Sequence, residues 1–277
     1  IMEGRGNSMG ARFAGMRPDV GPLGDKISSP GLNTAQIMEA AAQNGWEFLY
    51  VAGANLAAKM PSKLWQQVRN KLNFLVVQDL FLTETAQQAD VVLPTLTFIE
   101  KGGSFINIEG RVQTLLPGKE IPENAFSDGE IFTKIAQKLN LKFDLDPHFA
   151  AVLKPGKVPF TYAEEIKITH SQSPAKDALL AVFAYALFDQ GVRMEHNSHV
   201  AELIKNPYVR MHPLEAQKRG ILDGDAVKLS ANGNAICAKV KWDQKVALNT
   251  IVLPLGFKEI PVYEFGMNLL NGLPIEV

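Results

Sequence analysis

The feature that most constrains the fold is an alternation of short apolar runs with helical patterns between residues 34 and 141. The apolar runs cover residues 48–51, 74–77 and 91–93, and each is short enough to form one buried strand. Strands that alternate with helices at this spacing indicate βαβ units. The sequence therefore predicts a parallel sheet that is covered on both faces, with Val92 buried in one of its strands.

Signals for the ends of helices mark the segments between these runs. Asn33 or Thr34 can cap the beginning of a helix, and Gly45 stands where glycine is favoured just after a helix ends. Ser127 and Glu130 have the spacing of a capping box, in which each side chain bonds the backbone amide of the other residue. We therefore expect a Rossmann-like α/β domain over residues 34–141.

Apolar residues recur with a period of two in the second half of the chain. Val227 and Leu229 alternate with other residues, and Asn232 followed by Gly233 is a hairpin signal. The other alternating positions are Leu180 and Val182 before the hairpin and Ile236, Ala238, Val240 and Trp242 on its return strand. With a short helix around residues 213–219, the pattern predicts a small β-barrel over residues 178–277.

Two segments lack such periodicity. Residues 1–33 are rich in glycine, proline and serine, and we interpret them as an extended N-terminal segment without helices. Residues 142–177 have few long apolar runs and are interpreted as a linker that winds over the surface. Because the chain opens with Ile1, we interpret it as a fragment of a longer protein.

Charge and the metal-ligating residue types narrow the classes of function. The formal net charge is −1, which gives no basic excess for binding nucleic acid. Cys237 is the single cysteine, which excludes an internal disulfide, a CxxC zinc site and a cysteine-ligated iron–sulfur cluster. His196 and His199 are interpreted as surface or capping residues rather than metal ligands. The longest apolar run, at residues 178–187, is too short to span a bilayer.

Polar residues follow the first two predicted strands. Gly53 and Asn55 come just after the first strand, Asp79 ends the second, and Thr83 is expected to open a short helix. Open α/β sheets bind ligands at the carboxyl ends of their strands. Gly53 would let a phosphate approach the backbone there, and the polar side chains could hydrogen-bond a base or a ribose. The same residues also suit a tight turn and a helix cap, so both interpretations stay open.

A glycine-rich stretch supplies the remaining candidates. Glu109 and Arg111 stand on either side of a glycine. The guanidinium of Arg111 offers a planar fork for a phosphate or for a carboxylate, and we favour a structural salt bridge over ligand binding. Glu100 and Lys101, which precede this stretch, are expected to form an ion pair with each other.

One long motif resembles a known family. Residues 89–94 read Ala-Asp-Val-Val-Leu-Pro, and residues 98–113 read Phe-Ile-Glu-Lys-Gly-Gly-Ser-Phe-Ile-Asn-Ile-Glu-Gly-Arg-Val-Gln. Together they resemble the signature of molybdopterin-dependent oxidoreductases. The Pro213 to Gly220 segment and the Asp-Gly-Asp turn at 223–225 are similar to that family's dinucleotide-binding barrel. The resemblance implies a Rossmann-like domain followed by a β-barrel of double-psi type.

Within this family, the Glu-Gly-Arg-Val-Gln form at residues 109–113 is similar to the large G subunit of NADH–quinone oxidoreductase, respiratory complex I. Formate-dehydrogenase-type enzymes tend to have paired arginines there. The resemblance implies a peripheral-arm scaffold that supports electron transfer from NADH to quinone without a cluster or catalytic metal of its own. Iron–sulfur clusters are expected only in the part before Ile1. The positions that would face a pterin nucleotide, as a vestigial site, are Gly53, Asn55, Asp79, Thr83, Glu109 and Arg111.

The same resemblance implies partners and leaves two alternatives. The partners would be other subunits of NADH–quinone oxidoreductase, with membrane association only through the complex and without nucleic acid. The location would be the cytoplasmic side of the inner membrane or the mitochondrial matrix side. One alternative is a fragment of a molybdopterin-dependent enzyme of formate-dehydrogenase type that binds molybdopterin guanine dinucleotide. The other is a nucleotide-binding or scaffold module without a redox role.

Overall fold

A computed structural model describes most of the chain, and its contacts divide the chain into two compact units. The described residues are 6–25, 27–143, 156–157, 178–267, 269 and 272–277. The first unit comprises residues 1–54, 71–82 and 86–166, and the second comprises residues 55–70, 83–85 and 167–277. Each unit is therefore built from stretches that are separated in sequence. The predicted domain limits stay predictions.

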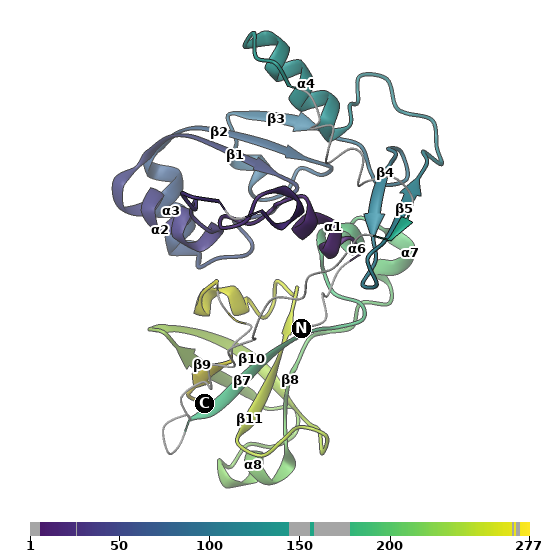
Figure 1. Cartoon of the computed structure of the whole chain (residues 1–277). Helices are drawn as coiled ribbons and strands as arrows, with labels where there is room; N and C mark the ends of the chain where they lie inside the picture. The colour runs from purple at the N-terminus through teal and green to yellow at the C-terminus, as the bar shows by residue number, and fades with distance from the viewer. Residues whose placement is uncertain (1–5, 26, 144–155, 158–177, 268, 270–271) are drawn as a thin grey trace. The chain divides into compact units, whose positions relative to one another are not determined.

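The first unit contains the predicted parallel sheet (Figure 1). Its strands are β1 (Trp46–Ala52), β2 (Leu72–Asp79) and β3 (Val91–Pro94), in the order β1-β2-β3 with both pairs parallel. The helix α2 (Thr34–Asn44) precedes β1, and the short 3-10 turn η2 (Ala86–Gln88) precedes β3. The predicted alternation of strand and helix is confirmed here.

The helix ends form where the sequence signals stand. Asn33 caps α2 by accepting a hydrogen bond from the amide of Gln36, whose side chain bonds the Asn33 amide in return. Gly45 follows with φ of 72°, and a Cβ there would lie 3.1 Å from the carbonyl oxygen of Lys71. Helix α4 (Asp128–Lys138) has the predicted capping box of Ser127 and Glu130. The short helix expected to open at Thr83 is shifted, because η2 begins only at Ala86.

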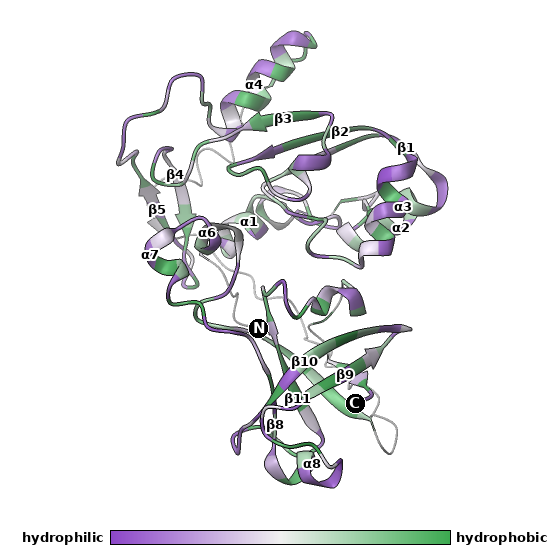
Figure 2. Ribbon diagram, turned by 180° about the vertical axis from the view of Figure 1, so that it is seen from behind, coloured by the Kyte–Doolittle hydropathy of each residue, from purple (hydrophilic) through white to green (hydrophobic). Residues whose placement is uncertain are grey.

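The parallel sheet buries one face much better than the other. Leu49, Val51, Leu75 and Val77 are buried and share one face. On the opposite face Phe48 is 52% exposed and stacks on Phe74, with 6.3 Å between ring centroids. Val92 lies in the edge strand β3 and is 39% exposed. The prediction that Val92 is buried is therefore wrong. The second face is covered in part, because Val76 and Gln78 on it are buried while Phe48 and Phe74 are exposed. β3 is an apolar strand with solvent beside it (Figure 2).

A small antiparallel sheet completes the described part of the first unit. It consists of β4 (Gly103–Ile106), β5 (Arg111–Leu115) and β6 (Gly156–Lys157). Helix α1 (Ser8–Phe13) packs Met9 and Phe13 against Ile106 and Val112, and η1 (Pro22–Gly24) follows it. The sequence predicts no helix in this region, because a six-residue helix shows too little of its period to be recognised.

The second unit is built around a six-stranded sheet of order β12-β7-β11-β8-β10-β9 (Figure 1). The strands are β7 (Leu179–Tyr185), β8 (Val209–Met211), β9 (Ala226–Ala231), β10 (Asn234–Trp242), β11 (Thr250–Leu255) and β12 (Leu273–Ile275). A bridge between Ser230 and Glu276 joins the two ends of this order, so the sheet is nearly closed. The prediction of a barrel-like second half is confirmed, and its double-psi connectivity stays a prediction.

The alternating pattern of the sequence gives this sheet its core. Leu229 on β9 and Ile236, Ala238 and Val240 on β10 all point inward as predicted, and Asn232 and Gly233 turn the hairpin with positive φ. On β7 the buried residues are Leu179 and Ala181, which are one position out of step with the predicted pair. Because β7 is apolar throughout, its sequence does not show which side faces the core.

Short helices occupy the other segments of the second unit. They are α3 (Ser62–Lys71), α6 (Val192–Glu195), α7 (Ser198–Ala201), α8 (Pro213–Lys218) and the 3-10 turn η3 (Val262–Phe265). The last residue of α3, Lys71, already belongs to the first unit. Helix α8 with Gly220 after it confirms the predicted helix. Of the predicted linker, residues 142–143 and 156–157 are described and the rest lies outside the described residues. Among the described residues, no helix is long and apolar enough to cross a bilayer.

Candidate functional site

The carboxyl ends of the parallel strands hold two of the predicted site residues. Gly53 follows β1 with φ of 61°, and its amide donates to the carbonyl oxygen of Gln78 at 2.8 Å. A Cβ at Gly53 would meet no atom within 4 Å, so the space beside this backbone is open. Asp79 ends β2, and its Oδ1 accepts a hydrogen bond of 2.7 Å from the amide of Leu80. The parallel register thus places Gly53 and Asp79 at the same edge of the sheet, as the sequence predicts.

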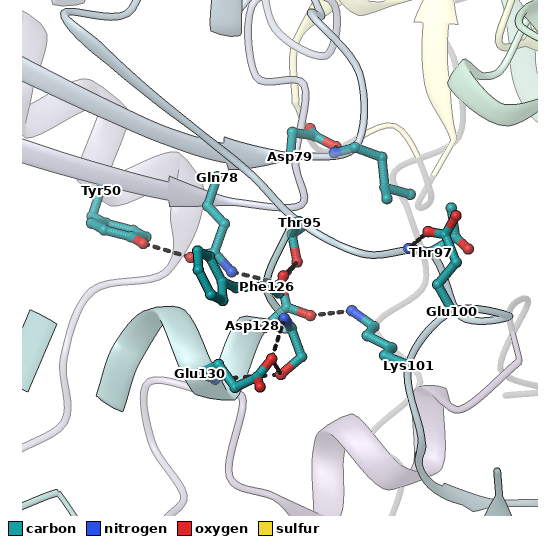
Figure 3. A network of polar contacts seen from close by, with 12 residues as sticks. Tyr50, Gln78, Asp79, Thr95, Thr97, Glu100, Lys101, Phe126, Asp128 and Glu130 are labelled. Atoms are coloured by element: carbon teal, nitrogen blue, oxygen red, sulfur yellow. Dashed lines mark hydrogen bonds and ion pairs between the residues drawn. The ribbon is translucent and has the colours of Figure 1, made fainter. Parts of the chain in front are cut away.

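A polar network joins β1, β2 and the residue after β3 to α4 (Figure 3). The Tyr50 hydroxyl donates to Oε1 of Gln78 at 2.5 Å, and Nε2 of Gln78 donates to Oδ1 of Asp128 at 2.6 Å. The same Asp128 oxygen accepts from the Thr95 hydroxyl at 3.0 Å. The ammonium of Lys101 donates to Oδ2 of Asp128. Gln78 is fully buried, so this network satisfies a polar side chain inside the sheet.

The network sets the charge state of its members. Burial would raise the pKa of Asp128, but hydrogen bonds from Lys101 and Gln78 and the positive charge of Lys101 outweigh it, so the pKa is lowered. Burial and the negative charge of Asp128 raise the pKa of Tyr50. Asp128 is therefore a carboxylate and Tyr50 a neutral donor at neutral pH.

The sequence prediction missed this network. Lys101 is expected from the sequence to pair with Glu100, but it pairs with Asp128, while Glu100 accepts a hydrogen bond of 2.9 Å from the amide of Thr97. That prediction is wrong because adjacent side chains diverge, whereas Asp128 reaches the loop from another element. The one signal in the sequence is Gln78, a polar residue that directly follows an apolar run and needs a buried partner.

Glu109 lies in the tight turn between β4 and β5, and Arg111 is the first residue of β5. The side chain of Asn107 organises this turn, because its Oδ1 accepts hydrogen bonds from the amides of Glu109 at 3.0 Å and Arg111 at 2.8 Å. Gly110 has φ of 80°, which favours glycine. Both charged side chains are exposed. The turn fixes their backbone and leaves the Arg111 guanidinium accessible.

In the second unit, Asn55 is the centre of a compact hydrogen-bonded group. Its Nδ2 donates to Oε2 of Glu84 at 2.6 Å, and its Oδ1 accepts from the Thr85 hydroxyl at 2.9 Å and the Thr85 amide at 3.3 Å. The Thr85 hydroxyl oxygen also accepts from the amide of Ala57 at 2.9 Å. Asn55 is 6% exposed, and Thr85 and Thr83 are buried. The Asn55 side chain therefore connects two loops of its own unit.

Charged residues extend this group toward the surface. The ammonium of Lys258 lies 3.4 Å from Oε1 of Glu84 and 2.6 Å from Oε1 of Glu195. Burial would raise the pKa of Glu84, but its hydrogen bonds, including the one from Asn55, and the charge of Lys258 lower it. The hydrogen bond to Glu195 and the two carboxylate charges raise the pKa of Lys258 against the effect of burial.

The cysteine and the histidine of helix α7 lie at exposed positions in the second unit. No group of three or more His, Cys, Asp or Glu side chains in the described part of the chain could hold a metal ion. Cys237 is exposed on β10. His199 lies in the short helix α7, capped by Asn197, and is exposed. The interpretation of the histidines as surface residues agrees with this placement.

Comparisons with known proteins define the class. The chain is similar in fold to acetylene hydratase from Pelobacter acetylenicus, with a TM-score of 0.61 over 88% of this chain and 43% of that chain at 14% identity. The family model "Molybdopterin oxidoreductase" matches residues 1–138, and the model "Molydopterin dinucleotide binding domain" matches residues 189–271. The chain belongs to the molybdopterin oxidoreductase family.

Curated relatives include formate dehydrogenase alpha subunits and NADH-quinone oxidoreductase G subunits. The F420-dependent formate dehydrogenase alpha subunit of Methanocaldococcus jannaschii is 26% identical, with 93% of this chain and 48% of the relative covered. The second NADH-quinone oxidoreductase G subunit of Rhizobium meliloti is 25% identical, with 99% of this chain and 37% of the relative covered. The chain thus spans less than half the length of these relatives.

The side chains present can be tested against a pterin dinucleotide. Asn55 does not fit the role of a dinucleotide contact, because its amide already bonds Glu84 and Thr85 and its side chain is buried. Asp79 is partly exposed and Arg111 is exposed, so both could reach a ligand, and for them the prediction stays a prediction. Turning Asn55 toward a ligand would leave buried partners without hydrogen bonds, at a cost of about 1–3 kcal/mol.

Proposed function

We propose that the chain is the C-terminal scaffold part of the G subunit of an NADH–quinone oxidoreductase, and that it holds no pterin cofactor. Its role is to support electron transfer from NADH to quinone by packing against neighbouring subunits. Relatives named as G subunits of this enzyme support the proposal, at 25% identity in Rhizobium meliloti and 28% in Streptomyces coelicolor. The proposed location is the cytoplasmic side of the inner membrane or the mitochondrial matrix side.

One observation carries the proposal. The side-chain amide of Asn55 contains both a hydrogen-bond donor and an acceptor. In the structure Nδ2 bonds Glu84 and Oδ1 bonds Thr85. A side chain that joins two loops in this way stabilises the fold and is not available to recognise a base. A site that once held a nucleotide can persist in this form, because the internal hydrogen bonds replace those to the ligand.

The test is the cofactor content of the protein in its native assembly. The longer polypeptide that contains this chain should be purified from molybdenum-replete cells, with molybdenum measured by mass spectrometry and pterin by fluorescence after oxidation. We expect co-purification with NADH–quinone reductase activity and neither molybdenum nor pterin in stoichiometric amount. Stoichiometric amounts of both would overturn the proposal. A known molybdopterin enzyme from the same cells serves as the positive control.

The second candidate is a molybdopterin-dependent enzyme of formate-dehydrogenase type. It is favoured by the formate dehydrogenase relative, which is as similar to this chain as the NADH-quinone oxidoreductase relatives are. In that case Asp79 and Arg111 are the residues that would hold the dinucleotide, and the cofactor would supply the redox chemistry. The same purification separates the candidates, because this one requires molybdenum, pterin and formate oxidation together. Nucleotide without molybdenum would favour a nucleotide-binding module.

A further inference from the structure

The outer face of the six-stranded sheet carries a continuous row of side chains across four strands. Val182 on β7 pairs with Val252 on β11, Val252 pairs with Arg210 on β8, and Arg210 pairs with Lys241 on β10. Residues that pair across neighbouring strands project from the same face of a sheet. The row is therefore apolar on β7 and β11 and basic on β8 and β10.

Two further cations extend the basic end of this row. Lys239 precedes Lys241 by two residues and so lies on the same face of β10. Lys228 on β9 faces Cys237, which puts it diagonally beside Lys239. All three lysines are exposed. We call the set Val182, Val252, Arg210, Lys241, Lys239 and Lys228 the docking face.

The charges of the docking face are only partly compensated. Arg210 and Lys241 stand side by side, and like charges opposite each other destabilise a sheet. Arg210 is paired with Asp243 at 3.1 Å, and the Lys241 ammonium lies 4.8 Å from the centre of the Tyr208 ring. Among the residues that the structure describes, no carboxylate lies within ion-pairing distance of the lysine ammoniums of this face.

The apolar end of the docking face lies on β7, whose residues are apolar on both faces of the sheet. A strand with one face in water normally alternates apolar and polar residues, as β10 does with its outward lysines. β7 instead reads Leu-Leu-Ala-Val-Phe-Ala-Tyr, so it is apolar on both faces. Val182 is 41% exposed, and its neighbour Val252 is half-buried. This strand has the composition of one that is covered on both sides.

We propose that the docking face binds an acidic protein segment that has apolar side chains beside its carboxylates. The inference rests on the proposed function in one respect, namely that the segment belongs to a neighbouring subunit. Protein interfaces commonly combine an apolar part with a polar, solvent-accessible rim, and the docking face has both an apolar part and a charged part. The chain as a whole has a net charge of −1, so its basic residues are concentrated locally at this end of the face. A small basic area of this kind suits an acidic protein segment better than a long polyanion such as a nucleic acid.

A site-specific crosslink identifies the occupant. Cys237 lies among the cations of the face, and replacing it by a photo-crosslinking phenylalanine analogue places the probe there. The full-length subunit with this substitution should be crosslinked in its native assembly and the captured peptide sequenced. We expect a peptide of another subunit with Asp or Glu next to apolar residues, captured less at high salt. A peptide without carboxylates, or assembly without any crosslink, would overturn the docking proposal.

Charge reversal tests the same face without a probe. Lys228→Glu with Lys239→Glu removes two cations that form no ion pair with any residue that the structure describes, and it leaves the Arg210 contacts in place. The matched control is Lys63→Glu with Lys205→Glu, which changes the net charge equally at exposed positions elsewhere in the second unit. We expect the docking-face pair to weaken binding of the crosslinked segment, supplied as a synthetic peptide, by about tenfold or more. Equal affinities of the two double variants would overturn the proposal.

Two more measurements separate the possible failures. If Val182→Thr, which keeps the β-branched shape, does not lower the affinity for the peptide, the apolar part of the proposal is wrong.

Sedimentation with phosphatidylserine vesicles should show no binding that depends on Lys228 and Lys239, and such binding would assign the face to a membrane instead. Failure of the wild-type subunit to assemble with an NADH–quinone oxidoreductase would contradict the proposed function. An acidic crosslinked peptide from another assembly would still support the docking face.

Discussion

The parallel sheet of the first unit and the six-stranded sheet of the second unit are both made of apolar strands, but they place these residues differently. The second sheet encloses a core that includes Leu229, Ile251 and Leu253, all fully buried. The first sheet buries Leu75 and Val77 on one face and is joined to α4 on the other by polar contacts. Apolar packing thus dominates one sheet, whereas a buried polar network contributes to the other.

Truncation of one core leucine in each sheet should show the largest effects. Leu253 and Leu75 are both fully buried. We expect Leu253→Ala to cost about 4 kcal/mol of unfolding free energy and Leu75→Ala about 3 kcal/mol, because a sheet with open edges can relax more around the lost side chain. Urea denaturation should be followed in parallel by hydrogen exchange, which reports on each unit separately. A larger loss for Leu75→Ala would contradict the comparison.

The described part of the second unit also contains a buried charge, that of Glu215, and its removal should be nearly as costly. The Glu215 side chain is 2% exposed, bonds Arg219, and accepts a hydrogen bond of 3.2 Å from the Asn249 amide. We expect Glu215→Gln to cost about 2 kcal/mol, because it removes the buried negative charge to which Arg219 donates a hydrogen bond. Hydrogen exchange should show the loss in the second unit and not in the parallel sheet. The control is Glu202→Gln at an exposed position, which we expect to change little.

The same carboxylate should make the second unit sensitive to acid. Burial would raise the pKa of Glu215, but hydrogen bonds from Arg219 and the Asn249 amide and the positive charge of Arg219 lower it below its ordinary value. Its stabilising contribution is therefore complete above the unfolded-state pKa and is lost as the pH falls through the lower folded-state pKa. The wild type should lose more stability than Glu215→Gln below about pH 4.3. Parallel losses in the two proteins would show that Glu215 is not responsible.

The polar network of the first unit should contribute less per residue. Asp128→Asn removes the charge that Lys101 and the Gln78 amide bond, but Asp128 is 40% exposed, so water compensates in part. We expect a loss of about 1–2 kcal/mol, confined to the first unit. Asp79→Asn is the matched control, because the Asp79 side chain bonds only the neighbouring Leu80 amide among the described contacts. Equal effects of the two substitutions in urea denaturation would contradict the role of the network.

The predictions that are confirmed rest on signals between residues close together in the sequence. Helix caps such as Asn33 and Ser127 act over three residues, so they are visible in the sequence and are confirmed. The alternation at Leu229 and Ile236 is likewise local. β7 has no polar residue to mark its outer side, so the prediction for Leu180 and Val182 had no signal to follow.

The site was less predictable, because its contacts join residues far apart in the chain. Gly53 and Asp79 were found from their places after strands, which the parallel register confirms. The partners of Asn55 and Lys101 lie about thirty residues away in sequence, and no local pattern identifies them. The roles of Gly53, Asn55, Asp79, Thr83, Glu109 and Arg111 toward a nucleotide stay predictions.

The smallest effect is expected at the edge of the parallel sheet. Val92 on β3 pairs with Val77 on β2, so the two side chains share a face, yet Val92 is 39% exposed and Val77 is fully buried. In Val92→Asp the new carboxylate can stay hydrated, and we expect a loss of about 0.5 kcal/mol. In Val77→Asp the carboxylate would be buried without a partner, and the first unit should fail to fold. Thermal unfolding of both variants measures the contrast. A strong destabilisation by Val92→Asp would mean that β3 is covered in solution, and the open edge of this sheet would then have to be assigned to an interface.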